Sequence, residues 1–435
     1  MKQLITAKLK LYATPEQFSA FRATQLAYRD ALNAVSRYAY AHGKMSNQRR
    51  LQEGTYDDIR ALYGLPAQMA CNVPRQVGAT YKGLWTRARK HAEMRRAGIS
   101  RKRYKGLDQP PTYVSPTLTY NNQRDYTLKA RQRVSILTLC GRVIVPYSGY
   151  TKHLALIRSG ASLGAAKLWY DQPHKQFYLL VSLEIELADP TFEQSTSLVG
   201  VDVGIRYLAV TSTSTGDPAF FAGKQTKHRA NHYARLRKRL QQKGTRGSKK
   251  KLRRIEQRER RLKLQVNHQI AKQIVAAHPQ AMIGLEELTD IRERTKARKR
   301  KKGGKGTDPA TPKMRRANRV HAQWSFAELH ALIAYKAALA GSLAIKVDAN
   351  YTSKACPKCG FTHEDNRPHK GLVFHCGNCH YQLHADLVGA RNIVMRTLWF
   401  RQVWSQTGQL SVAPDVSDKE AKALRLQRYK ELRWS

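Results

Sequence analysis

The sequence predicts a multidomain α+β protein, on three observations. Residues 112–189 hold short runs in which apolar and polar side chains alternate, as in half-buried strands. The opening segment QLITAKLKLY, residues 3–12, alternates in the same way, whereas the stretch between the two segments has helical apolar spacing. A new set of apolar strands starts at Ser197, and two Cys-x-x-Cys pairs follow near the carboxyl end. We therefore expect a β domain with a helical insertion, then a mixed domain that carries a metal-binding ribbon.

The net charge of the chain is its most unusual property. Its 435 residues include 78 Lys and Arg against 31 Asp and Glu, which gives a formal net charge of +47. Hydrophobic residues make up 41% of the chain, enough for packed cores, and this excludes a disordered basic tail. Because a charge of this size repels itself, we expect a polyanionic partner, and nucleic acid is the usual one.

Several classes of protein are excluded. The opening MKQLITAKLKLYATPEQ has no apolar core, so we expect no secretory signal. The most apolar stretch, residues 326–347, is interrupted by charged side chains, so we expect no membrane span. Four of the six cysteines are clustered in pairs, which indicates a metal site in a reducing compartment rather than disulfides. Cys71 and Cys140 are isolated, and we expect both side chains to be buried.

The first half of the chain is expected to be a β domain interrupted by helices. Thr14 has the character of a helix N-cap, with Pro15 in the first turn and Gln17 at the capping-box distance. Helical spacing then continues, with Gly and Pro between helices, before the strand pattern begins. We place a first strand within residues 1–12, a helical insertion at 13–105 and the rest of a small β-barrel or sheet at 106–194.

The second half begins with the buried strand SLVGVDVG, a glycine turn and the strand RYLAVTST. Residues 224–263 then hold 18 Lys or Arg in 40 positions, yet an apolar stripe persists, so we expect a basic helical hairpin over 224–280. Another apolar strand, AMIGL, follows at residues 281–285. Residues 292–319 hold 13 Lys or Arg without periodicity, which predicts a loop that becomes ordered on nucleic acid.

The two cysteine pairs predict a zinc site. Cys356 and Cys359 are separated by sixteen residues from Cys376 and Cys379, a spacing that suits a small ribbon with one tetrahedral Zn²⁺. Because four thiolates leave no open coordination position, we expect this ion to be structural. The histidines nearby are expected to face the surface or nucleic acid rather than the metal; they are His363, His369, His375, His380 and His384.

Three carboxylates stand out because acidic residues are scarce. Asp202 lies within an apolar strand, Glu286 at the end of another, and Asp386 at the start of a helix. Each has an ordinary alternative: Asp202 could pair with an arginine, and Asp386 could be only an N-cap. Together they predict a two-metal site, in which two Mg²⁺, or Mn²⁺ instead, lie roughly 4 Å apart. Glu287 competes with Glu286, and strand alternation points the two side chains to opposite faces.

The order of these motifs resembles the RuvC-like nucleases of the TnpB family, which are accessory proteins of insertion sequences related to compact type V CRISPR effectors. The strings that carry the resemblance span roughly residues 195–397 and are GVDVGIRYLAV, IGLEEL, WSFAELHALIAYKAALAG, TSKACPKCG, CGNCH and HADLVGARNI. The family's three acids fall on Asp202, Glu286 and Asp386, and its zinc ligands on the four paired cysteines. Where many members have Asp-Arg-Asp, this chain has His-Ala-Asp, which still supplies the third acid.

The resemblance implies a fold and a domain order. It implies a wedge β-barrel interrupted by a helical recognition domain, then an RNase H-like RuvC nuclease domain with an inserted zinc ribbon. In the second half, the implied boundaries are a first nuclease segment at 195–348, a target-binding zinc ribbon at 349–381, a second nuclease segment at 382–400 and a tail at 401–435.

The resemblance also implies RNA-guided DNA cleavage. The protein would bind a structured guide RNA and recognise a short motif beside the target, while base pairing reads the rest. The implied partners are guide RNA, double-stranded target DNA and the RNA–DNA heteroduplex, with no membrane. We expect one protein per RNA, with a dimer as the alternative, in the cytoplasm of a prokaryotic host and at the nucleoid when bound to DNA.

Two other functions fit the same residues. A guide-independent DNA transposase uses the RNase H-like fold too, so the fold alone does not decide. A non-cleaving, nucleic-acid-binding regulator of transposition is the other alternative. Such a regulator is expected to lack one of the acids, and none is missing from this sequence.

Overall fold

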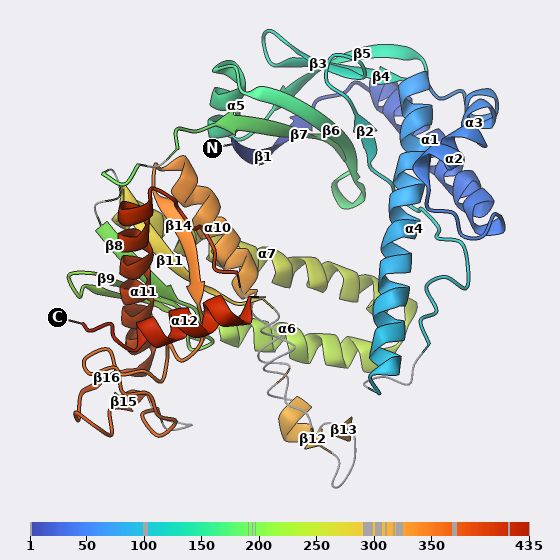
Figure 1. The fold of residues 1–435 in the computed structure, drawn as a ribbon. Helices are drawn as coiled ribbons and strands as arrows, with labels where there is room; N and C mark the ends of the chain where they lie inside the picture. The colour runs from blue at the N-terminus through green and yellow to red at the C-terminus, as the bar shows by residue number, and fades with distance from the viewer. Residues whose placement is uncertain are drawn as a thin grey trace. The chain divides into compact units, whose positions relative to one another are not determined.

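The computed structural model divides the chain into two compact units, drawn in Figure 1. The first comprises Met1–Glu186 with Arg300–Thr307, and the second comprises Leu187–Lys299 with Asp308–Ser435. The described residues are 2–98, 103–189, 191–193, 195, 197–289, 299–300, 307–308, 311–315, 318, 325–367, 372–415 and 418–434. The basic loop expected at 292–319 therefore lies mostly outside the described residues, apart from short segments such as the strands β12 (Lys299–Arg300) and β13 (Thr307–Asp308).

The first unit is built on a seven-stranded sheet in the order β2-β6-β7-β1-β5-β4-β3. Its strands are β1 (Lys2–Leu11), β2 (Leu118–Tyr120), β3 (Tyr126–Lys129), β4 (Arg133–Thr138), β5 (Gly141–Ser148), β6 (Ser162–Asp171) and β7 (Gln176–Glu186). The first strand lies between β7 and β5 and is antiparallel to both. The predicted alternation in β1 is present: Ile5, Ala7 and Leu9 are buried, and the residues between them are exposed.

This sheet is nearly closed. The Tyr126 hydroxyl on β3, at one end of the strand order, donates to the Gly164 carbonyl on β6 at 2.7 Å. The Tyr120 hydroxyl on β2, at the other end, donates to the Leu137 carbonyl on β4 at 3.1 Å. Among the described residues no strand ladder joins β2 to β3. The expected barrel is therefore a strongly curved sheet whose two ends are linked by tyrosine side chains.

Four helices are inserted between β1 and β2: α1 (Pro15–Ala41), α2 (Gln48–Glu53), α3 (Tyr56–Tyr63) and α4 (Ala67–Arg96). The predicted capping box starts α1, because Thr14 and Gln17 each accept a hydrogen bond from the other's backbone N–H. Asn72 of α4 donates to the Thr119 carbonyl on β2 at 3.0 Å, which joins the helices to the sheet. The sequence pattern did not predict the helix α5 (Thr151–Arg158) or the short 3₁₀ helix η1 (Gln172–His174).

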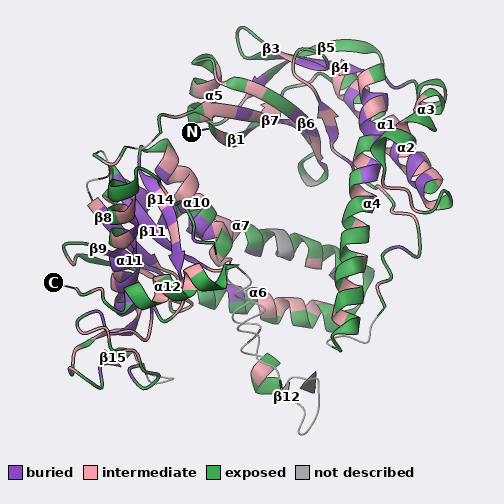
Figure 2. Cartoon of the chain, viewed as in Figure 1, coloured by how far each residue is buried: buried purple, intermediate pink, exposed green. Residues whose placement is uncertain are grey.

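The second unit contains a mixed five-stranded sheet in the order β10-β9-β8-β11-β14. Its strands are β8 (Ser197–Asp202), β9 (Tyr207–Thr213), β10 (Pro218–Ala222), β11 (Ala281–Glu287) and β14 (Leu343–Asp348). The strands β8, β9 and β10 form an antiparallel meander, while β11 and β14 run parallel to β8. All seven residues of β11 are buried, and Figure 2 shows this strand in purple among its neighbours.

Helices cover both faces of this sheet. On one face the apolar residues of β8 and β11 pack against α7 (Arg246–Ala277) and α10 (Phe326–Leu339). On the other face Leu198 and Met282 pack against Ile393 and Val394 of α11 (Ala385–Thr407). Alternate residues of each strand therefore face different helices, which decides where the polar residues at the strand ends point.

The basic hairpin predicted between β10 and β11 consists of α6 (Lys224–Lys243) and α7. Buried Glu259 forms ion pairs with Arg237 at 2.5 Å and Lys263 at 2.8 Å, which join the two helices. The other Lys and Arg side chains of residues 224–263 are exposed. The unit ends with the ribbon strands β15 (Val373–His375) and β16 (Gln382–His384), then α11 and α12 (Lys419–Tyr429). Within the stretches of chain that the structure describes, no helix has both the length and the apolarity needed to cross a bilayer.

Candidate functional site

Helix α11 lies directly on the strands that carry two of the predicted acids, because glycines remove the side chains between them. Gly200 on β8 is paired in register with Gly284 on β11. A Cβ at Gly200 would overlap the Ala390 carbonyl oxygen, and one at Gly284 would overlap the Thr397 hydroxyl. On α11 itself, a Cβ at Gly389 would lie 3.0 Å from the Asp202 carboxylate. The backbone of α11 therefore meets the backbone of β8 at Gly200, its Thr397 side chain lies against Gly284, and Asp202 lies against the helix.

The three predicted acids lie at the ends of β8 and β11 and at the start of α11, the helix that packs on these two strands. Asp202 and Glu286 lie one position beyond the registered pair Val201–Leu285, at the same ends of neighbouring parallel strands. Burial, and then the charges of Glu286 and Asp386, raise the pKa of Asp202 well above its ordinary value. Burial also raises the pKa of Glu286, against a hydrogen bond from Thr352. A nearby positive charge would stabilise the ionised forms of these two carboxylates, of which Glu286 is buried and Asp202 half-buried.

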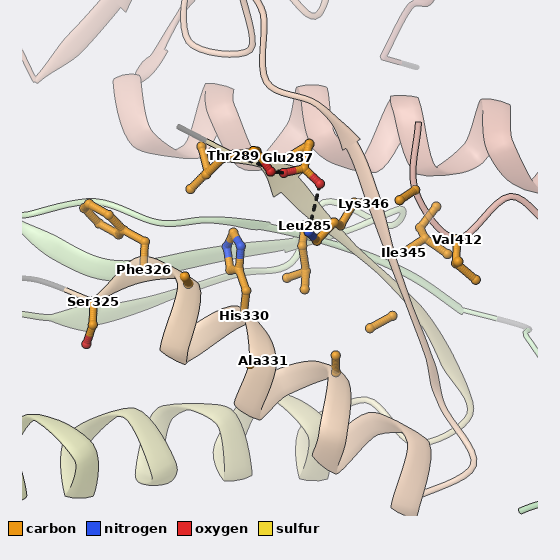
Figure 3. Close-up of a pocket in the computed structure, with 15 residues that line it drawn as sticks. Leu285, Glu287, Thr289, Ser325, Phe326, His330, Ala331, Ile345, Lys346 and Val412 are labelled. Atoms are coloured by element: carbon orange, nitrogen blue, oxygen red, sulfur yellow. Dashed lines mark hydrogen bonds and ion pairs between the residues drawn. The ribbon is translucent and has the colours of Figure 1, made fainter. Parts of the chain in front are cut away.

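Glu286 and Glu287 differ in the groups that stabilise their carboxylates. Glu287 faces the opposite side of the sheet, where its carboxylate lies 2.8 Å from the Lys346 ammonium and accepts a hydrogen bond from the Thr289 backbone at 2.9 Å (Figure 3). Although burial acts to raise it, these contacts lower the pKa of Glu287. Glu286 has no ion-pair partner within 4.0 Å among the described residues, and its contact is the Thr352 hydroxyl at 2.5 Å. A cation is therefore better suited to Glu286 than to Glu287.

Sequence reasoning missed one residue of this site, Arg367. It lies in the ribbon between the two cysteine pairs, and its guanidinium is 2.6 Å from the Asp386 carboxylate. Its charge also opposes the rise in the pKa of both Asp202 and Glu286. Among the many arginines of the chain, nothing in the local pattern marks this one, because only the fold of the ribbon brings it to the acids.

The ordinary explanation of Asp386 as an N-cap is wrong. The cap of α11 is His384, whose imidazole accepts a hydrogen bond from the Asp386 backbone N–H at 3.3 Å. The His384 ring packs edge-on against Tyr207 and Phe220, on β9 and β10. The carboxylate of Asp386 is therefore available to face Arg367 and the other two acids.

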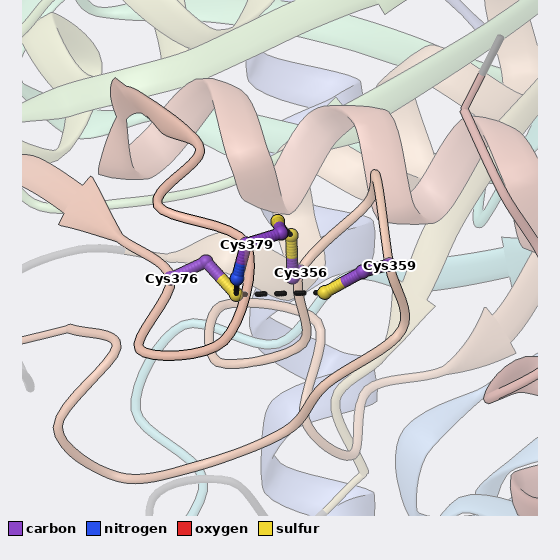
Figure 4. Close-up of side chains that lie close together, drawn as sticks. All are labelled: Cys356, Cys359, Cys376 and Cys379. Atoms are coloured by element: carbon purple, nitrogen blue, oxygen red, sulfur yellow. Dashed lines mark hydrogen bonds between the residues drawn. The ribbon is translucent and has the colours of Figure 1, made fainter.

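The four predicted zinc ligands converge (Figure 4). Their sulfurs all lie within 4.8 Å of one another, with Cys356–Cys379 at 3.6 Å and Cys359–Cys376 at 3.5 Å. Four thiolates ~2.3 Å from one ion form a tetrahedron with edges of about 3.8 Å, so these residues fit a structural Zn²⁺. Within the described residues, no other set of three or more His, Cys, Asp or Glu ligand atoms is gathered as tightly.

The carboxylates fit Mg²⁺ by their chemistry rather than by such close packing. Carboxylate oxygens are the ligands that a hard cation prefers, and a cation would lower the cost of burying Asp202 and Glu286. The three acids interact electrostatically, but Asp386 is paired with Arg367 rather than drawn against the other two.

The remaining cysteines and histidines contribute no ligand to this cluster. The expectation for Cys140 is wrong, because its side chain is exposed, and Cys71 is only half-buried. His363 stacks on Phe361, and the rings of His375 and His380 lie 5.7 Å apart. His369 lies outside the described residues.

Comparisons with known proteins agree with these motifs. Residues 326–393 match the family described as "Cas12f1-like, TNB domain", and residues 181–298 match a family described as "Probable transposase", OrfB of IS605.

The CRISPR-associated endodeoxyribonuclease Cas12f1 of Sulfoacidibacillus thermotolerans is 24% identical over 299 residues, which are 65% of this chain and 64% of the relative. InsQ of Escherichia coli (strain K12), described as a putative RNA-guided DNA endonuclease, is 27% identical over 263 residues, 58% of this chain and 61% of the relative. These matches agree with the resemblance of the sequence motifs to the TnpB family.

The chain matches less than two thirds of the length of either relative. Among solved structures, that of the mini RNA-guided endonuclease CRISPR-Cas phi3 has a TM-score of 0.49 and 10% identity, covering 91% of this chain and 92% of that one. The family-model matches include Asp202, Glu286, Asp386 and all four clustered cysteines.

Proposed function

We propose that this protein is an RNA-guided DNA endonuclease in which Asp202, Glu286 and Asp386 hold two Mg²⁺. The observation that carries the proposal is the placement of these acids around the contact of β8, β11 and α11, with the pKa values of Asp202 and Glu286 both raised. Bound there, the ions would activate a water for attack on a phosphodiester and stabilise the leaving 3′ oxygen. The mixed strand order of the second unit supports an RNase H-like, RuvC-type assignment.

The residues around the acids would bind and orient the nucleic acid and would not take part in the bond cleavage. Arg367 carries a positive charge beside Asp386 and is suited to contact a substrate phosphate, as guanidinium groups do. The exposed Lys and Arg of α6 and α7 would bind nucleic-acid backbones without reading sequence. The four cysteines would hold a structural Zn²⁺ that keeps the ribbon, and with it Arg367, at the acids.

The proposed partners are a structured guide RNA and a double-stranded DNA target. The two named relatives are described as an endodeoxyribonuclease and as a putative RNA-guided DNA endonuclease, which supports this choice. In RNA-guided recognition the protein binds a short DNA motif beside the target, and base pairing between RNA and DNA recognises the rest of the target sequence.

The experiment is cleavage of target DNA by the protein copurified with RNA from its native flanking DNA. The wild-type complex is expected to cut in Mg²⁺, EDTA to stop it, and Asp202→Ala to abolish cutting while RNA binding persists. Cleavage that survives in an Asp202→Ala, Asp386→Ala double variant would refute the assignment of the site.

A guide-independent transposase is the second candidate, because one matched family is described as a transposase. RNase treatment of the purified complex separates the two functions. Loss of DNA cleavage after RNase supports the guided nuclease. Strand joining that continues after RNase, with no RNA copurified, would support the transposase instead.

A further inference from the structure

The segment that follows β14 is clamped against α11 by two side chains from one face of that helix. Asn392 donates to the carbonyls of Thr352 and Ala355, at 2.6 and 2.9 Å. Arg396, one turn further along, donates to the carbonyl of Asp348 and to that of Asn350, the latter at 2.6 Å. Both side chains are almost fully buried, with exposed fractions of 4% and 3%. Burying the charged guanidinium of Arg396 costs free energy, which its contacts with backbone carbonyls and with the Tyr429 ring offset only in part.

The clamped turn contains an uncommon backbone conformation. Tyr351 has a φ of +61°, in the left-handed region that residues other than glycine rarely adopt. Its side chain is exposed, so packing of the ring does not compensate for this conformation. The hydrogen bonds from Asn392 and Arg396 stabilise the turn in this conformation. Thr352 directly follows Tyr351 in the turn.

The hydroxyl of Thr352 is the point at which this turn meets the acids. It lies 2.5 Å from Oε1 of Glu286 and 3.2 Å from the Ala349 carbonyl. Because a hydroxyl donates one proton, the shorter contact takes it. One oxygen of Glu286 is thereby fixed by a neutral donor, which leaves the other oxygen to face a cation.

The same turn is held from its other side by the C-terminal helix. The buried carboxylate of Asp348 accepts hydrogen bonds from Arg425 at 2.8 Å and from the Tyr429 hydroxyl at 3.0 Å, both on α12. The Tyr429 ring lies against the Arg396 guanidinium, 4.4 Å from ring centroid to carbon. Polar contacts and the backbone of residues 348–352 therefore connect α12 to Glu286.

We propose that Thr352 is a positioning residue for Glu286, and that the buried network from Asn392 and Arg396 to Asp348, anchored by α12, sets the orientation of this carboxylate toward a divalent cation. The inference rests on the proposed two-metal site and adds residues that orient it. Groups that orient a ligand from behind commonly change metal affinity or activity by roughly 10–100-fold when removed.

The first test compares Thr352→Val with Thr352→Ser in the RNA-bound protein. Valine keeps the shape and removes the donor, so the Mg²⁺ concentration for half-maximal cleavage is expected to rise about tenfold or more. Serine keeps the donor and is expected to restore the wild-type value. Binding of Mn²⁺, followed by electron paramagnetic resonance, is the second readout, and the Asp202→Ala complex serves as the blank for Mn²⁺ held by RNA.

The second test probes the far end of the network with a matched pair on α12. Arg425→Gln removes the ion pair with Asp348 and is expected to weaken Mn²⁺ binding in the same direction as Thr352→Val. Arg428→Gln removes only an exposed ion pair with Glu431, so its affinity for Mn²⁺ is expected to equal that of the wild type.

The outcomes separate this inference from the proposed function. A wild-type complex that neither binds Mn²⁺ above the blank nor cleaves DNA would overturn both. A wild type that does both, with Thr352→Val unchanged in Mn²⁺ binding and Mg²⁺ dependence, would overturn only the positioning role. A lower melting temperature in Thr352→Val with unchanged Mn²⁺ affinity would also overturn it, because the hydroxyl would then serve stability alone.

Discussion

Gly200 and Gly284 lie opposite each other in the parallel pairing of β8 and β11, and α11 packs on both, with its backbone against Gly200 and the Thr397 side chain against Gly284. This one contact places Asp386, at the start of α11, beside the ends of the two strands that carry Asp202 and Glu286. The glycines have no role in the chemistry, yet the distance between helix and sheet depends on them.

Gly200→Ala is therefore expected to destabilise the second unit by about 3 kcal/mol, because the new methyl group would meet the backbone of α11, which cannot rotate away. At Gly284 the obstacle is the Thr397 side chain, so Gly284→Ala is expected to cost less when combined with Thr397→Ala. Gly247→Ala on α7, where a Cβ meets nothing within 4 Å, is the control. Thermal unfolding of the three single variants and the double variant tests the ranking, and equal melting temperatures for Gly200→Ala and Gly247→Ala would contradict it.

Adjacent glutamates on β11 provide a matched pair for the site. Glu286→Gln is expected to reduce DNA cleavage by at least about a hundredfold, since it removes a ligand charge from the acids. Glu287→Gln breaks only the ion pair with Lys346 on the opposite face, and cleavage is expected to stay within about threefold of wild type. Single-turnover cleavage at saturating Mg²⁺ is the measurement. The reverse ranking would assign the site to the wrong face of the sheet.

Removal of zinc is expected to act on the acids through the ribbon. Cys376→Ser should lose the bound zinc, loosen the ribbon and release Arg367 from Asp386, so both stability and cleavage are expected to fall. Elemental analysis of the purified protein measures the zinc content, and a melting curve measures the stability. Cys140→Ser changes an exposed thiol outside the cluster and should keep full zinc content. Full zinc content in Cys376→Ser would show that the cluster is not the zinc site.

His330 on α10 is expected to make the second unit sensitive to acid. Burial, with a smaller effect of Lys346, lowers the pKa of His330 from 6.5 to about 4, and the side chain projects from α10 toward the strands (Figure 3). The unfolded chain therefore takes up this proton near pH 6.5, whereas the folded chain does not until about pH 4. The stability is present above pH 6.5 and is lost as pH falls toward 4, by up to about 3 kcal/mol.

His330→Leu is expected to flatten this region of the stability profile, measured as melting temperature between pH 7.5 and pH 4.5. His363→Gln is the control, because that imidazole is more than half exposed. If wild type and His330→Leu lose the same number of degrees over this range, the buried imidazole is not the source of the acid sensitivity.

Much of the fold followed from local patterns. The alternation of apolar and polar residues predicts β1 and β7, and the capping box predicts the start of α1. Apolar residues at helical spacing among many Lys and Arg predict α6 and α7. These features depend on periodicity and on contacts a few residues apart, which a single sequence displays directly. How far the first sheet closes did not follow, because the Tyr126–Gly164 bond joins residues whose proximity depends on the register of every intervening strand.

The candidate site divides in the same way. The sequence by itself determined which side chains are available: three scarce acids at the ends of apolar segments, two cysteine pairs at ribbon spacing and an excess of positive charge. Alternation also determined that Glu286 and Glu287 face opposite sides. Only the tertiary structure decided which side α11 covers, that Arg367 reaches Asp386, and that α12 returns to Asp348. Those relationships depend on long-range packing between surfaces with no shared periodicity, so no local pattern in the chain encodes them.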